Sequence, residues 1–211
     1  MTAPAVGRPP CNGGCSAEGV LLEAATVGWN VIEAGVALIA GLVAGSGALV
    51  GFGLDSGIEV FAAGLVIARL RATLRDGEPD EDRERRALRN IAVSFYALAG
   101  YLLLGGVVAL ATASRPETSP VGIAVTGAAA LIMPVLALSK RRVGRAAGND
   151  LLIAEASESL LCASLSITTL LALLLVSTVG WAWADPVAGF VIAAFAIREG
   201  REAWAGGLCC D

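Results

Sequence analysis

The sequence predicts an all-α membrane protein with six transmembrane helices, and composition and spacing both support this fold class. Of the 211 residues, 56% are hydrophobic and 16% are charged, and the mean hydropathy is +0.73. A soluble domain of this length does not bury so much apolar surface. The apolar residues also fall into segments of about 20 residues, which is the length that crosses a bilayer as a helix. Most soluble enzyme folds are thereby excluded.

Six predicted spans follow one another with short connections. The first directs insertion itself, because the preceding residues lack the pattern of a cleavable signal peptide. The second and fifth contain acids in otherwise apolar sequence. The third follows an acid- and arginine-rich connector at 71–89, which is predicted to be solvated and partly helical, and the fourth ends before a basic run. The spans are 24–45, 47–70, 90–113, 120–139, 151–177 and 182–200.

The basic residues predict the orientation of the chain. They cluster in the second and fourth connections and near the two termini, and Arg115 alone falls on the other side. The positive-inside rule therefore places both termini in the cytoplasm. We expect the protein to lie in the plasma membrane. We expect a cytoplasmic segment at 1–20, a transmembrane domain at 21–204 and a short cytoplasmic tail at 205–211.

The composition also limits the chemistry. A net charge of −4 and a pI of 4.9 argue against nucleic acid as a partner. The chain contains no histidine, so metal or proton chemistry falls to carboxylates and thiols. Without histidine no nucleophile and base pair stands out, and neither an enzyme nor a bound cofactor is expected. The predicted partners are membrane lipids, a divalent metal ion and protons.

Asp55 and Glu59 are the first acids inside a predicted span. Charged groups within the bilayer are expensive and are retained mainly where they meet a partner, a cavity or an ion. Their spacing stacks both carboxylates on one helix face about 6 Å apart. Two anions repel at that distance unless a cation or a proton lies between them. This pair therefore predicts a metal ligand set.

The fifth span carries a second set, in which Glu155, Glu158 and Cys162 share one helical stripe with Ser159 beside them. If the second and fifth spans pack together, the two sets meet at one membrane depth, and four ligands suit a tetrahedral divalent metal. Small residues on the two spans would permit this packing. The alternative is that the acids are protonated and tie the bundle together by hydrogen bonds. The small residues are Gly53, Gly57, Ala156 and Ala163.

Two further groups of residues have open interpretations. Glu33, one turn from Asn30 in the first span, is predicted to relay protons, to support the metal ligands or to make an ordinary interhelix hydrogen bond. Cys11 and Cys15 near the N-terminus, with Cys209 and Cys210 near the C-terminus, fall on the cytoplasmic side. These four thiols either capture a soft metal or remain free.

Three segments resemble the cation diffusion facilitator family. SGALVGFGLDSGIE is similar to its second helix, KRRVGRAAGNDLLIAEASESLLC to its fourth connection and fifth helix, and WAWADPVAGFVIAAFAIREGREAW to its sixth helix. The resemblance covers 24–204 and implies a six-helix, proton-coupled exporter of zinc and related divalent metals, in a cation-efflux-like bundle. It places Asp55, Glu59, Glu158 and Cys162 at the transport-site positions, with Glu155 as a neighbour, and it suggests a homodimer.

The chain departs from the family pattern in two respects. The family's usual site contains a histidine, whereas here the four positions hold three carboxylates and one thiolate. The identity of the metal therefore stays open among Zn, Cd, Co, Fe and softer ions. We also expect a short form without the family's C-terminal cytoplasmic domain. The sequence therefore predicts proton-driven efflux of a divalent transition metal. The alternative is a membrane-embedded metal sensor or a structural partner protein that does not transport.

Overall fold

The computed structural model describes residues 17–76, 81–147 and 150–205, without the side chains of 17–20, 62–63, 65–85, 87–88 and 147–155. The described residues form helices and connections, with no strand, so the predicted all-α fold is confirmed. The helices are α1 (Ala17–Ala44), α2 (Gly47–Asp76), α3 (Glu81–Ala111), α4 (Pro120–Ala147), α5 (Asp150–Val179) and α6 (Ala184–Trp204).

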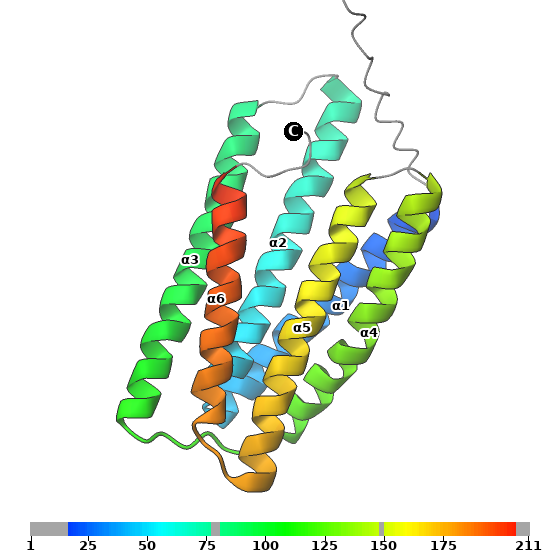
Figure 1. Ribbon diagram of the computed structural model, residues 1–211. Coiled ribbons are helices and arrows are strands. Elements are labelled where there is room, and N and C mark those ends of the chain that lie inside the picture. Colours follow the sequence, from blue (N-terminus) through cyan, green and yellow to red (C-terminus); the bar gives the residue numbers. More distant parts are fainter. Residues whose placement is uncertain (1–16, 77–80, 148–149, 206–211) are drawn as a thin grey trace, which may run out of the picture.

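The six helices run side by side in one bundle (Figure 1). α1 packs against α2 and α4, α4 packs against α5, and α3 packs against α6. α2 also contacts α3, α5 and α6, so it runs through the middle of the bundle. Residues on α2 therefore lie where several helices meet, which makes this helix a suitable position for buried polar groups.

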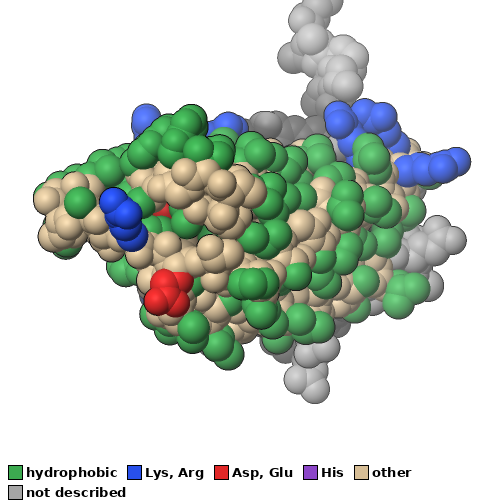
Figure 2. Space-filling model, turned by 90° about the horizontal axis from the view of Figure 1, so that it is seen from below, with side chains coloured by type: hydrophobic (Ala, Val, Ile, Leu, Met, Phe, Trp, Pro, Cys, Tyr) green, Lys and Arg blue, Asp and Glu red, His purple; other side chains and the backbone are tan. Residues whose placement is uncertain are grey.

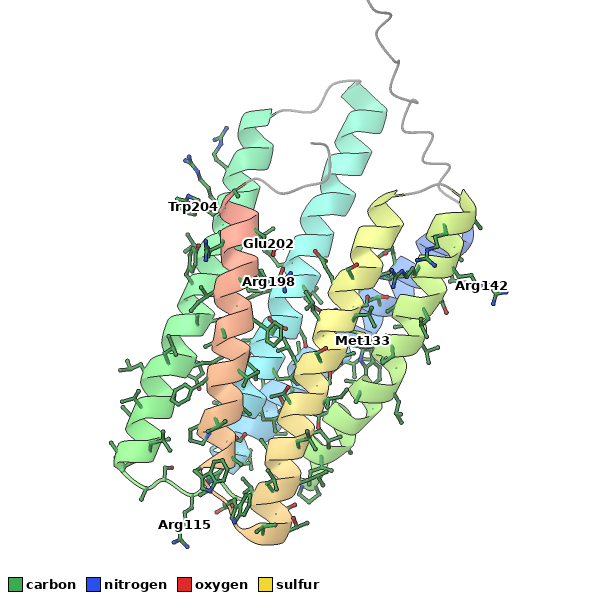
Figure 3. The ribbon with its side chains drawn as sticks, viewed as in Figure 1. Arg115, Met133, Arg142, Arg198, Glu202 and Trp204 are labelled. Carbon is green, nitrogen blue, oxygen red and sulfur yellow. The ribbon has the colours of Figure 1, made fainter. Side chains whose placement is uncertain are left out.

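The two ends of the bundle differ in charge. The α2–α3 and α4–α5 connections, the start of α1 and the end of α6 lie at one end, which is called the basic end below. Figure 3 shows Arg142 and Arg198 toward this end, and Lys140 and Arg141 directly precede Arg142 on α4. Arg115 lies at the opposite end, where charged side chains are sparse (Figure 2). The bundle thus separates the basic residues as the sequence predicts.

Among the described residues, four helical segments are long and apolar enough to cross a membrane. They are Leu21–Ala44, Arg89–Ala111, Pro120–Ala146 and Ala156–Val179. α2 and α6 are not among them, and both carry charged residues within the bundle. Together with the six-helix arrangement, these segments identify an integral membrane protein.

Several helices extend beyond the predicted spans. α2 continues to Asp76, α3 begins at Glu81, and α4 continues to Ala147. The apolar pattern stops where charged residues begin, but Arg and Glu are good helix formers, so the helices continue past the apolar segment. The predicted partly helical connector is confirmed at 71–76 and 81–89, and 77–80 lie outside the described residues.

The turn between α1 and α2 fixes how deep α2 sits in the bundle. Gly45 has φ of +64°, a left-handed conformation that glycine adopts without strain. Asp185 of α6 accepts hydrogen bonds from the backbone N–H of Gly47 at 2.9 Å and from the Ser46 hydroxyl. A carboxylate at a helix N-terminus satisfies free N–H groups and the helix dipole. The first turn of α6 therefore anchors the start of α2.

Gly53 of α2 brings that helix close to α1. A Cβ on Gly53 would lie 2.9 Å from the backbone nitrogen of Leu38 on α1. Gly57, one turn later, has open space around its Cα and is exposed. The prediction that both glycines support packing between the second and fifth spans is therefore wrong. Gly53 instead allows close contact between α1 and α2, because the rotation of α2 about its axis turns this position toward α1.

Replacing Gly53 with alanine is expected to destabilise the bundle, whereas Gly57→Ala serves as the matched control. The new methyl group would press on the α1 backbone, and such overpacking costs about 1–3 kcal/mol. At Gly57 the methyl group has room, and alanine favours a helix over glycine by about 1 kcal/mol. Thermal unfolding of the detergent-solubilised variants measures the difference. Equal melting temperatures for Gly53→Ala and the wild type would contradict the close contact.

Candidate metal site

Asp55 and Glu59 of α2 lie in the middle of the bundle. They are about 12 and 18 Å along the helix from its first residue, Gly47, which is near mid-depth of a hydrocarbon core about 30 Å thick. Asp55 is buried, with 5% of its surface exposed, and Glu59 is partly buried. Their carboxylates interact electrostatically, as their one-turn spacing predicts.

Cys162 brings α5 to this pair. Its side chain is fully buried, its Sγ lies 3.7 Å from Oε1 of Glu33, and it also interacts with Glu59. The residues at 59 and 162 are far apart in sequence, so only the packing of α2 beside α5 places them together. The structure thus joins Asp55, Glu59 and Cys162 in one group, as the sequence predicts.

Glu158 lies at the open edge of this group. Residues four apart differ by about 40° around a helix, so Glu158 shares the side of α5 that carries Cys162. It is nevertheless exposed, and its carboxylate interacts electrostatically with Glu59. Ser159 is buried beside it, and the side chain of Glu155 lies outside the described residues. Asp55 and Cys162 are therefore buried within the group, whereas Glu158 lies at its exposed edge.

Glu33 of α1 connects three helices. Its fully buried carboxylate accepts hydrogen bonds from the Ser56 hydroxyl of α2 at 2.7 Å, from the Cys162 thiol of α5 and from the Trp29 indole of α1. A buried carboxylate needs such donors, because burying an unpaired charge is strongly unfavourable. Glu33 therefore holds α1, α2 and α5 together next to the acids of α2. A role in proton relay stays a prediction.

Asn30 approaches the group from one turn away on α1. It is 4% exposed, and its Nδ2 donates a hydrogen bond to Oε2 of Glu59 at 2.8 Å. The side-chain oxygen of Asn30, Oδ1, is buried and has no hydrogen-bond partner. Both α1 residues singled out in the sequence thus lie against the acids of α2.

Glu199 of α6 is a neighbour that the sequence reasoning missed. It interacts electrostatically with Asp55, and its Oε1 is buried without a hydrogen-bond partner. Glu199 lies fourteen residues after Asp185, which rotates it by about 40° around the helix. Because Asp185 faces α2, this periodicity was the signal that would have placed Glu199 near Asp55.

Two other polar features lie apart from this group. Lys140 of α4, the only lysine of the chain, is fully buried and lies 3.1 Å from the carboxylate of Glu23 on α1. At the opposite end, a cavity of about 240 Å³ is lined by residues that include Ser46 and Asp185. Cys11, Cys15, Cys209 and Cys210, predicted to capture metal, lie outside the described residues.

The acids of this group lie close enough to repel one another, but among the described residues they do not form a preformed metal site. Among the described residues, no three or more of Asp, Glu and Cys are arranged to hold a metal ion as they stand. The carboxylates of Glu33, Asp55 and Glu59 repel one another in the low dielectric of the bundle interior. Either cations or protons would relieve this repulsion.

The chain matches the family model of the cation efflux transmembrane domain over residues 24–204, which include all the candidate site residues on α1, α2 and α5. A search of curated protein sequences finds no match.

Proposed function

Because this chain belongs to the cation diffusion facilitator family and is a membrane-embedded cation transporter of that kind, we propose that it exports a divalent transition-metal ion from the cytoplasm. The proposed site lies between α2 and α5 and consists of Asp55, Glu59, Glu158 and Cys162. The observation that carries the proposal is the meeting of Glu59 and Cys162 from two helices at mid-depth of the bundle.

The donor chemistry supports a transition metal. Carboxylate oxygens bind most divalent cations, whereas a thiolate favours zinc, cadmium and softer ions. A site with both kinds of donor binds borderline metals such as zinc, cobalt and iron(II). Acids at this depth are expensive to keep, and a cation that passes through the site offsets this cost.

Proton antiport is the proposed source of energy. A metal binds the deprotonated forms of carboxylate and thiol, so protons compete with it for the same atoms. When the site faces a more acidic outer side, protons displace the metal, and the protonated site then favours return to the inward-facing state. Affinity for the metal is therefore expected to fall as the pH falls.

The basic end is proposed to face the cytoplasm, with the protein in the plasma membrane. Lys140, Arg141, Arg142 and Arg198 gather at that end and follow the positive-inside rule. The open edge at Glu158 lies on the half of α5 nearer the basic end. Metal would thus enter the site from the cytoplasm past Glu158.

Metal uptake by proteoliposomes tests the proposal. Vesicles with an acidic interior are supplied with zinc, cadmium, cobalt, iron(II), manganese or mercury(II), and uptake is followed over time. We expect at least one metal to accumulate with the gradient, no uptake by Asp55→Ala, and normal uptake by Glu202→Gln. Glu202 is an exposed partner of Arg198 on α6 and serves as the control. Binding of every metal without uptake would contradict transport and favour a sensor.

A further inference from the structure

The side-chain oxygen of Asn30 is a buried polar atom without a hydrogen-bond partner beside the proposed site. The residue is 96% buried, since its exposed fraction is 4%, and its Oδ1 contacts no donor, although its Nδ2 is bonded to Glu59. Burying a carbonyl oxygen without a partner is unfavourable, because the atom loses its hydrogen bonds to water. Natural proteins rarely keep such an atom unless it has a function, such as binding a water molecule or an ion.

We propose that Oδ1 of Asn30 is a ligand of the transported cation, which makes α1 the third helix of the site. This inference rests on the proposed function. Amide oxygens are ordinary ligands of hard divalent cations. The amide can keep its N–H bond to one oxygen of Glu59 while its own oxygen binds a cation that the other oxygen of Glu59 also binds. Asn30 thus adds one neutral oxygen ligand from α1 to the acids and the thiol of the proposed site.

The extra ligand narrows the class of substrate. With Asn30, the donor set has oxygens from four side chains and one sulfur, whereas structural and catalytic zinc sites are mostly four-coordinate. Oxygen-rich sites with more than four ligands suit manganese(II), iron(II) and other ions that accept five or six donors. With this donor set, the site is expected to bind a larger, oxygen-preferring divalent cation that tolerates one thiolate more tightly than it binds zinc.

Calorimetric titration of the purified full-length protein in lipid nanodiscs tests this assignment, with Mn²⁺ and Zn²⁺ as the probes. Asn30→Ala removes both the oxygen and the N–H group, whereas Asn30→Asp keeps an oxygen and loses the N–H group. Thr26→Ala is the matched control, because Thr26 is also buried on α1, one turn away, and its hydroxyl bonds only to the Leu22 carbonyl in the same helix.

We expect Asn30→Ala to weaken Mn²⁺ binding by about tenfold or more and Zn²⁺ binding by less, Asn30→Asp to restore Mn²⁺ binding, and Thr26→Ala to bind both metals normally. If Asn30→Asp is as defective as Asn30→Ala and both metals weaken equally, Asn30 only positions Glu59 and the assignment is overturned. Glu59→Gln separates the two claims: unchanged binding in that variant would overturn the proposed site itself. Size-exclusion profiles that match the wild type establish that the variants fold.

Discussion

Replacing Glu59 with glutamine is expected to abolish metal transport. Glutamine has almost the same shape, so it fills the same space and still accepts the hydrogen bond from Nδ2 of Asn30. It removes one negative charge from the centre of the proposed site, where Asp55, Glu158 and Cys162 all interact with Glu59. Loss of a ligand in this position is expected to weaken metal binding by about 100-fold, or about 2.7 kcal/mol.

Binding and uptake assays on the same preparation test this expectation. Glu202→Gln makes the same chemical change on an exposed surface of α6 and is expected to leave both properties unchanged, since exposed ion pairs contribute little. Wild-type uptake in Glu59→Gln would show that the cation follows another route. Loss of uptake in both variants would indicate that the bundle is sensitive to any change of charge.

Replacing Cys162 with serine is expected to change which metal binds. Serine is similar in size, but its hydroxyl is a far weaker ligand for soft metals than a thiolate. We expect cadmium affinity to fall by about tenfold or more, while manganese affinity changes little. The ratio of the two affinities, measured by titration, separates this effect from general damage to the site.

Ser164→Ala provides the comparison for this variant, because Ser164 is exposed on the other side of α5 and bonds within its own helix to the Leu160 carbonyl. It is expected to bind cadmium normally. An unchanged preference for cadmium in Cys162→Ser would show that the thiol does not touch the metal and serves only as a donor to Glu33.

The sequence was sufficient to predict the helices and the acids of the site. Transmembrane segments have a minimum length, and charges within them stand out against an apolar background. Asp55 and Glu59 were identified for that reason, and Cys162 because it lies one turn after Glu158 on the same helical stripe. The structure brings the three residues together. The resemblance to a known family also assigned the transport-site positions to these two spans.

The contacts between helices were harder to predict, because they depend on how each helix is rotated. Gly53 and Gly57 have the same local pattern, yet one packs on α1 and the other is open. The hydrogen bond from Asn30 to Glu59 joins residues 29 positions apart and has no signature in either segment. Glu199 lies among the charged residues Arg198, Arg201 and Glu202 near the end of its helix, so the sequence did not distinguish it from solvated side chains.

The position of a bound metal tests the central claim most directly. Crystals of the protein grown in lipid with Cd²⁺ would show the ion as an anomalous difference peak. The account predicts a peak at mid-depth between α2 and α5, within coordination distance of Glu59 and Cys162, that disappears in Glu59→Gln. A peak confined to the buried pair of Glu23 and Lys140 or to the cavity beside Asp185, with none at Glu59, would contradict it.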